Sequence, residues 1–345
     1  MEERFLFVII NGTCALGMAY IKGIVDMRTF KVRLLACAIL TSMLVTSGCG
    51  KSALTEETVE SQAAETTIEI AEETEAETTE ETEAPFHQKE IVIDYYKIPD
   101  IYSSYLSEEE IAVYNEFVTA WLNYEPMIEF DDISKMGNVW GMIKECFFLT
   151  YGDFDEEIGG FLVVGNTLYF NYESKSKEEH DRIIRDFEER VLSFYDGIDE
   201  GEEGIELARH IYINYNMTLD YDYDLYESEN YTFKNSSGYV AMMEGGGVCS
   251  SFAKAYSFLL RQAGVEAFDT SAPKHEWTML KIDDKYYFAD PTWDYTYDPE
   301  YYEYFCFGLD QREADGFKEE EMILCCNGDF LMSDYITVER ENYYK

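Results

Sequence analysis

The stretch Gly245-Gly246-Gly247-Val248-Cys249-Ser250-Ser251-Phe252 leads from three glycines into a cysteine. Behind the cysteine, apolar residues recur every three or four positions as far as Gly264, which predicts a helix that ends at a glycine cap. Cys249 is therefore predicted at the N-terminus of this helix. There the helix dipole and the free N–H groups favour the thiolate, which is the nucleophilic form of cysteine. The glycines, with Gly247 close to the cysteine, let the backbone turn sharply and leave room for a substrate.

A second stretch, His275–Ile282 followed by Lys285–Asp290, is typical of two strands joined by a tight turn. If Asp283-Asp284 is a two-residue loop, the register places Trp277 opposite Asp290. A slip of one residue would move one set of side chains to the other face of the sheet, so the register is a checkable prediction.

In this register His275, Trp277 and Asp290 share one face, because side chains alternate along a strand. His275 and Asp290 are then diagonal neighbours with Cα atoms roughly 7–8 Å apart, and their side chains can close that gap to a hydrogen bond. We expect His275 to take the proton of Cys249 or to form an ion pair with its thiolate, and Asp290 to orient the imidazole and stabilise its charged form. Backbone N–H groups near Cys249 would stabilise the substrate's carbonyl oxygen.

Three motifs in this order, Gly-Val-Cys at a helix start, His-x-Trp at a strand start and Asp-Pro-Thr-Trp-Asp after the next strand, resemble the transglutaminase-like superfamily. The resemblance covers about residues 204–310. It implies an α+β, papain-like fold in which the nucleophile helix packs on an antiparallel sheet. It also implies that Cys249 is the nucleophile, His275 the base and Asp290 the acid.

The same resemblance implies that Trp277 and Gly247 support these three residues from beside them. The sequence departs from the family pattern at Glu276 and Thr278, where members often have a small residue and an asparagine. Glu276 is expected on the face opposite His275 and is therefore expected to be tolerated. The resemblance implies nothing about the substrate and requires no cofactor.

The N-terminal residues 1–48 have the parts of a secretory signal, with basic residues, a short apolar run and small residues before a cysteine. Thr46-Ser47-Gly48-Cys49 is similar to a bacterial lipobox, although members usually have leucine where Thr46 stands. Met27 begins a segment of ordinary signal-peptide length, so we expect it to be the true start. Cys49 would carry the lipid, which places the chain on the extracellular face of a bacterial cell membrane.

Residues 49–85 are expected to form a tether, because this Glu- and Thr-rich stretch has too few apolar residues to offset its ordering entropy. The whole chain of 345 residues has 70 acidic and 26 Lys and Arg residues, which gives a formal charge of −44. Nucleic-acid binding needs clusters of basic residues, so it is excluded as an expected function. The acidity is expected to be mostly a solvated surface, with attraction of cationic substrates as a secondary role.

Residues 86–200 are predicted to form a smaller α+β region, which precedes the transglutaminase-like domain of residues 201–310. A β-leaning run at 90–96 and strands at 147–151 and within 160–172 are expected. Ser107 and Ser176 each stand three residues before a glutamate, the spacing of a capping box at a helix start.

The second part is expected to begin with a helix at Gly204 and to end with a strand at Tyr301–Phe307, followed by an extension over 311–345. A disulfide from Cys306 to Cys325 or Cys326 is possible in an exported protein, but its connectivity is not deducible. No cysteine pair has metal-ligand spacing with a nearby histidine, so no metal site is predicted.

Three functions remain open from the sequence. The first is a thiol enzyme that transfers or hydrolyses an acyl group at a peptide or glutamine carbonyl, as a protease, a deamidase or a cross-linking enzyme. Its substrate would be a protein or a peptidoglycan peptide. The second is a non-catalytic module that binds a wall peptide or a protein in the same cleft. The third, an arylamine-acetyltransferase type of thiol enzyme, is disfavoured by the lipid anchor and by the Asp-Pro-Thr-Trp stretch.

Overall fold

The computed structural model of the chain describes residues 6–7, 86–104, 106–155, 159–295, 302–326 and 330–344. Apart from residues 6–7, the predicted targeting segment, the lipidation site Cys49 and the tether lie outside the described residues. None of the helices in the described ranges has both the length and the apolar character needed to cross a membrane. The described residues from 86 onward belong to one compact unit of mixed helices and sheets, so the chain is α+β.

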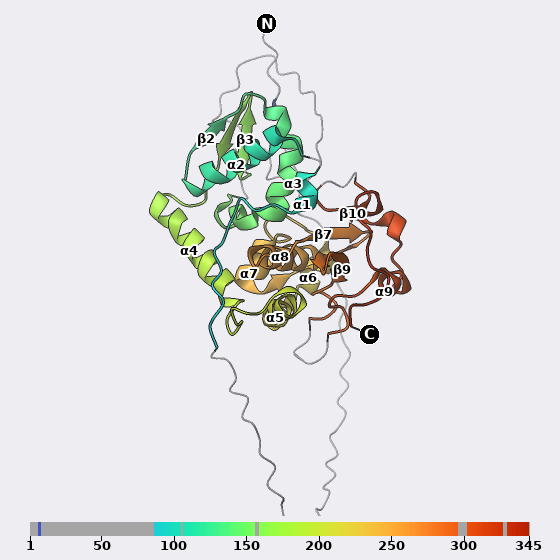
Figure 1. Ribbon diagram of the computed structural model, residues 1–345. Coiled ribbons are helices and arrows are strands. Elements are labelled where there is room, and N and C mark those ends of the chain that lie inside the picture. The colour runs from blue at the N-terminus through green and yellow to red at the C-terminus, as the bar shows by residue number, and fades with distance from the viewer. Residues whose placement is uncertain are drawn as a thin grey trace, which may run out of the picture. The chain divides into compact units, whose positions relative to one another are not determined.

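The first part of this unit is built on a small antiparallel sheet, which lies beside helices α2 and α3 (Figure 1). Its strand order is β1-β3-β4-β2. The strands are β1 (Leu6–Phe7), β2 (Met127–Glu129), β3 (Phe161–Val164) and β4 (Thr167–Phe170). The helices are α1 (Asp100–Ser103), α2 (Glu108–Leu122), α3 (Met136–Cys146) and α4 (Lys177–Ser193), with short 3-10 helices η2 (Ile133–Lys135) and η3 (Phe148–Asp153).

Helix α2 begins where its sequence predicts. The Ser107 hydroxyl accepts from the Glu110 N–H at 3.2 Å, and the Glu110 carboxylate accepts from the Ser107 N–H at 2.8 Å, so the capping box is complete. The apolar stripe of the helix is buried, which also follows the prediction. Its buried side chains include Tyr114, Phe117, Val118 and Trp121.

The hairpin of β3 and β4 and the start of α4 also follow the sequence. Gly165 has a φ of +62°, as the expected turn between the two strands requires. The Ser176 hydroxyl caps α4 by accepting from the Glu179 N–H at 3.3 Å. The box is only half formed, because the Glu179 carboxylate accepts from the Lys175 N–H rather than from Ser176.

Three of the expected strands are wrong. The run at 90–96 has no regular structure, ends in a turn and joins no sheet, and residues 148–151 lie in the 3-10 helix η3. The side chains of η3 are buried on every side, and a continuous apolar run cannot distinguish a strand from a buried helical turn. Among the described residues 302–307, only Phe307 makes a bridge, to Phe288, so the expected final strand is an isolated pairing.

The second part is built on an antiparallel sheet of order β10-β7-β8-β9. Its strands are β7 (Ala267–Ala272), β8 (His275–Ile282), β9 (Lys285–Ala289) and β10 (Ile323–Leu324). The helices are α5 (Gly204–Asn216), α6 (Tyr223–Ser228), α7 (Gly238–Glu244), α8 (Cys249–Gln262) and α9 (Leu309–Ala314). Short elements are β5 (Asp220–Tyr221), β6 (Gly246–Gly247) and the 3-10 helices η4 (Glu319–Glu321) and η5 (Met332–Asp334).

Helix α8 is the centre of this part, between the sheet on one side and α5 and α7 on others (Figure 1). It is fixed to the sheet by polar contacts as well as by apolar packing, since the Thr278 hydroxyl of β8 donates to the Ala253 carbonyl at 3.1 Å. The predicted arrangement of a cysteine-bearing helix on an antiparallel sheet is therefore present.

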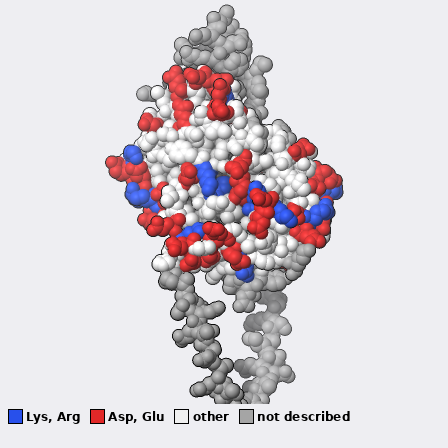
Figure 2. Space-filling model, viewed as in Figure 1, with Lys and Arg blue, Asp and Glu red and all other residues white. Residues whose placement is uncertain are grey.

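The two parts share one hydrophobic core. Phe148 of η3 packs against Phe187 of α4 and Phe258 of α8, with ring centroids 6.1 and 5.2 Å apart. Residues on both sides of the expected boundary at 200 thus stabilise each other. Acidic side chains are spread over the visible face of this unit and outnumber the basic ones (Figure 2).

Candidate active site

The segment before Cys249 is held in place by a short parallel pairing. Strand β6 lies beside β5, with the Asp222 N–H donating to the Gly247 carbonyl at 2.9 Å. Gly247 has a φ of +136°, and a Cβ on it would lie 2.7 Å from the Cβ of Ser251. Both the backbone conformation and the close approach require glycine here, which agrees with the role predicted for Gly247.

Cys249 is the first residue of α8 and is partly exposed. The preceding residue, Val248, is extended, and its N–H donates to the Ser251 hydroxyl at 3.4 Å. The first N–H groups of a helix have no partners within the helix, so those of Cys249 and Ser250 are left to bind other acceptors. The thiol is therefore next to donors that favour an anion.

The β8–β9 hairpin has the predicted register. Ile282 pairs with Lys285 and Thr278 with Ala289, so the next pair along the ladder would be Trp277 and Asp290. The loop Asp283-Asp284 has φ of 50° and 61°, as a two-residue turn between twisted strands requires.

This register brings two of the predicted site residues into contact. His275 Nε2 lies 2.6 Å from Asp290 Oδ2, and the Asp290 side chain is fully buried. The exposed fraction of the His275 side chain is 9%. Trp277 is buried, and its ring centroid lies 5.6 Å from that of His275. Trp293 covers the imidazole in a stacked arrangement, with ring centroids 5.2 Å apart.

Cys249 is close enough to His275 to help raise its pKa, both by a side-chain interaction and by its charge. Since Nε2 faces Asp290, Nδ1 is the ring nitrogen left for the thiol. Burial alone would lower the pKa of His275, but the charge and hydrogen bond of Asp290, together with Cys249, raise this pKa to about 9. The imidazolium is therefore the favoured form beside the thiol at neutral pH.

Asp290 has a partner that the sequence did not predict. Its Oδ2 also accepts from Arg312 Nη2 at 2.8 Å, and its Oδ1 accepts from the Thr292 N–H at 3.2 Å. Burial acts to raise the pKa of Asp290, but His275 and Arg312 together lower it below its ordinary value. Arg312 lies beyond residue 310, so the expected boundary of the domain excludes a residue that contacts the site. No sequence motif or regular spacing connects Arg312 with Asp290, which lies 22 residues earlier in the chain.

Asp294, the last residue of the Asp-Pro-Thr-Trp-Asp stretch, fixes the loop behind the site. It accepts from the Tyr212 hydroxyl at 3.0 Å and from the Tyr304 N–H at 2.7 Å. Burial raises the pKa of Asp294 to about 7 despite these hydrogen bonds. This carboxyl therefore titrates near neutral pH.

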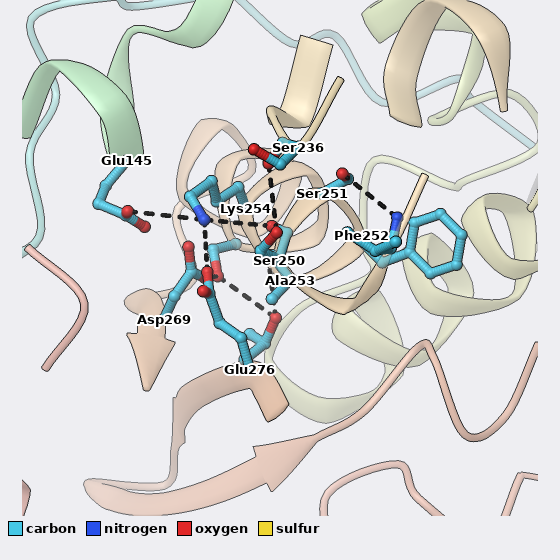
Figure 3. Close-up of polar contacts among 12 residues, drawn as sticks. Glu145, Ser236, Ser250, Ser251, Phe252, Ala253, Lys254, Asp269 and Glu276 are labelled. Atoms are coloured by element: carbon cyan, nitrogen blue, oxygen red, sulfur yellow. Dashed lines mark hydrogen bonds and ion pairs between the residues drawn. The ribbon is translucent and has the colours of Figure 1, made fainter. Parts of the chain in front are cut away.

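A cavity of about 320 Å³ lies on the α8 side of the sheet and is lined by Ser250 and Lys254 of α8, among others. The Lys254 ammonium lies 2.5 Å from Glu276 Oε1 and 3.7 Å from Glu145 Oε1 (Figure 3). Glu276 thus points away from His275, as predicted, and its charge is paired. Four further lining residues are Lys144, Tyr151, Phe233 and Cys325.

Glu145, Asp269 and Glu276 bring carboxylate oxygens within 4.8 Å of one another and are the group in the described ranges that fits a metal ion. Lys254 lies among them, and its ammonium already supplies the cation that such a group needs (Figure 3). Asp269, whose pKa is raised well above its ordinary value first by burial and then by Glu145, shares a hydrogen bond with Glu145. The Lys254 ammonium therefore offsets part of the negative charge of the group, and the prediction of no metal site stays a prediction.

None of the remaining cysteines in the described ranges forms a disulfide, and this includes the three candidates Cys306, Cys325 and Cys326. Cys306 and Cys326 are buried, and burial raises the pKa of the Cys306 thiol. Cys249 differs from these two because it is partly exposed at a helix start beside a histidine.

Comparison with known proteins adds little to this geometry. No family model matches the chain. No curated protein matches it either. A solved structure described as a crystal structure of a TGase is similar over 40% of this chain and 44% of that chain, with 12% identity and a TM-score of 0.29. This chain thus spans less than half of that chain's length, and at these values the likeness carries no argument about the site.

Proposed function

We propose that the chain is a transglutaminase-like thiol enzyme that transfers or hydrolyses an acyl group at a peptide or glutamine carbonyl. The observation that carries the proposal is the order of contacts Cys249–His275–Asp290, with the thiol at the N-terminus of α8 and the carboxylate buried. A structural cysteine requires neither the helix start nor the charged histidine beside it.

The reaction follows from this order of groups. The Cys249 proton resides on His275, so the reaction begins from a thiolate paired with the imidazolium. The thiolate attacks the carbonyl carbon, and the carbonyl oxygen becomes an oxyanion. The N–H groups of Cys249 and Ser250 face this oxygen. When the C–N bond breaks, the leaving ammonia or amine takes the proton from His275, and a thioester on Cys249 remains. Water or a second amine then attacks the thioester, His275 takes its proton, and the thiol is restored as the product leaves.

The proposal includes a place for the enzyme. A lipid on Cys49 would hold the protein at the extracellular face of a bacterial membrane, with residues 50–85 as the tether. A folded body on a tether there reaches proteins and peptidoglycan peptides, which are the substrates we propose. Support for this part comes from the sequence of the N-terminal segment alone.

The thiol chemistry is tested first by labelling. The purified protein is treated with limiting iodoacetamide near neutral pH, and each cysteine is quantified by peptide mass spectrometry. Cys249 is expected to react faster than free glutathione at the same pH, which is the reference for an ordinary thiol. His275→Asn is expected to abolish this difference. Equal labelling in the unmodified protein would sink the proposal of an activated thiol.

The reaction type is tested by ammonia release from glutamine peptides and from peptidoglycan peptides. Release that needs no amine indicates hydrolysis or deamidation, whereas release with incorporation of a fluorescent amine indicates cross-linking. Cys249→Ala is expected to remove turnover in every case. If a peptide binds the protein but no acyl-enzyme forms on Cys249, the chain is a binding module that uses the same cleft.

A further inference from the structure

Arg312 is a fully buried cation that contacts the carboxylate of the proposed triad, as His275 does. Its Nη2 and His275 Nε2 use the same oxygen, Asp290 Oδ2, at 2.8 and 2.6 Å. Because Asp290 is completely buried, the charge of Arg312 affects the protonation of His275 through this shared carboxylate.

Aromatic rings hold the guanidinium in this position. The Arg312 carbon Cζ lies 4.3 Å from the ring centroid of Trp277 and 4.8 Å from that of Trp293. Both tryptophans also contact the ring of His275. Other rings within reach of the guanidinium are Phe307 at 4.7 Å and Phe317 at 5.2 Å. A planar guanidinium suits such a site because it can stack on rings while one edge donates to a carboxylate.

We propose that Arg312 is a positioning residue for the reaction proposed above, and that it acts through Asp290 to let His275 release its proton during each turnover. The inference rests on the proposed function, because it assigns a step of that reaction to Arg312. It adds α9 to the machinery, an element that the sequence places in an extension outside the domain.

His275 must be neutral at one point in each turnover. The first half of the reaction ends when His275 gives its proton to the leaving group, and the second half begins with His275 neutral. If Arg312 were absent, Asp290 would then be a buried carboxylate without a balancing positive charge, which is costly. Arg312 supplies the balancing charge, so the neutral imidazole becomes accessible.

The positive charge of Arg312 lowers the pKa of His275. Arg312 is a positive charge close to the imidazolium, and it also stabilises Asp290 when His275 is neutral. Removal of its charge therefore favours the protonated imidazole on both counts and raises the pKa of His275 above its value of about 9. The other groups that face this cluster are Cys249 from α8, and Asp294 and Asp315 near Asp290.

The test compares Arg312→Gln, which removes the charge but keeps a donor, with Arg312→Lys, which keeps the charge. The midpoint of His275 is measured by NMR titration of the full chain, and the pH dependence of ammonia release is measured in parallel. Arg312→Gln is expected to raise both midpoints by about one pH unit or more. Arg312→Lys is expected to leave the His275 midpoint closer to that of the unmodified protein.

Arg340→Gln is the matched control, because Arg340 also pairs with α9, through Asp310 and Glu313, but is exposed and does not contact Asp290. A folded Arg312→Gln protein with an unchanged His275 midpoint overturns the inference. If that variant does not fold, Phe307→Leu loosens the guanidinium and is expected to give a smaller shift in the same direction. No shift there overturns the inference equally.

The two proposals can fail separately. The NMR midpoint needs no turnover, so it tests Arg312 even if no substrate is ever found. Conversely, ammonia release by the unmodified protein together with unchanged midpoints in the variants would remove only the role of Arg312. A fall in activity of Arg312→Gln without a shift of either midpoint would mean that the arginine is merely structural.

Discussion

His275 Nε2 and Asp290 Oδ2 lie 2.6 Å apart although 15 residues separate them in the chain. The hairpin accounts for this, because β8 and β9 place the two residues at the same open end of the ladder and on one face. The contact is also the strongest reason for the raised pKa of His275. It is therefore the first relationship to test by substitution.

Asp290→Asn is expected to slow ammonia release by about 100-fold or more, because the imidazolium loses its counter-charge and His275 loses its orientation. The pKa of His275 should fall from about 9 towards its ordinary value in the same variant. Both are measured per folded molecule, since the buried Arg312 keeps only its longer ion pair, to Asp315 at 3.9 Å. Asp284→Asn at the exposed turn of the same hairpin is the control, and equal rates in the two variants would contradict the role of Asp290.

Gly247→Ala is expected to lower the labelling rate of Cys249 and to cost about 1–3 kcal/mol of stability. The reason is the φ of +136° together with the approach of a new Cβ to Ser251, which lies in the first turn of the helix that carries the thiol. Gly264→Ala at the other end of α8 imposes a φ of +88° without any nearby atom. It should cost stability, measured by urea unfolding, but leave labelling unchanged. A Gly247→Ala protein that labels like the unmodified one would rule out this positioning role.

The geometry around His275 and Asp290 was predictable because it is local. A two-residue turn and strict alternation fix the register over the whole hairpin, and the start of α8 follows from apolar periodicity and glycines. Arg312 was not predictable, because its contact with Asp290 depends on how α9 folds back over the sheet. The same limit explains η3: the apolar run at 147–151 meets other elements on all sides, and only tertiary packing decides its conformation.

Lys254→Met is expected to destabilise the protein by roughly 3–5 kcal/mol at neutral pH, because it leaves the buried carboxyl groups around it without their cation. Burial alone would lower the pKa of Lys254, but Glu145 and Glu276 raise it well above its ordinary value, so the ammonium is charged in the folded protein. Glu276→Gln should reduce the free energy of unfolding by less, because Lys254 still forms its ion pair with Glu145. The unfolding free energies of both variants measure this order, and a reversed order would contradict it.

The last prediction concerns Asp294 and the pH dependence of stability. Burial raises the pKa of Asp294 from 3.8 to about 7, so between these values the folded protein keeps a proton that the unfolded chain has lost. The folded state then binds more protons than the unfolded state, and its stability falls as pH rises through this window. Asp294→Asn removes the titration while keeping an acceptor for Tyr212 and the Tyr304 N–H. Its unfolding free energy should therefore fall less steeply with pH than that of the unmodified protein. Asp196→Asn, at an exposed site, should retain the original slope, and parallel curves for all three proteins would show that Asp294 is ionised throughout the window.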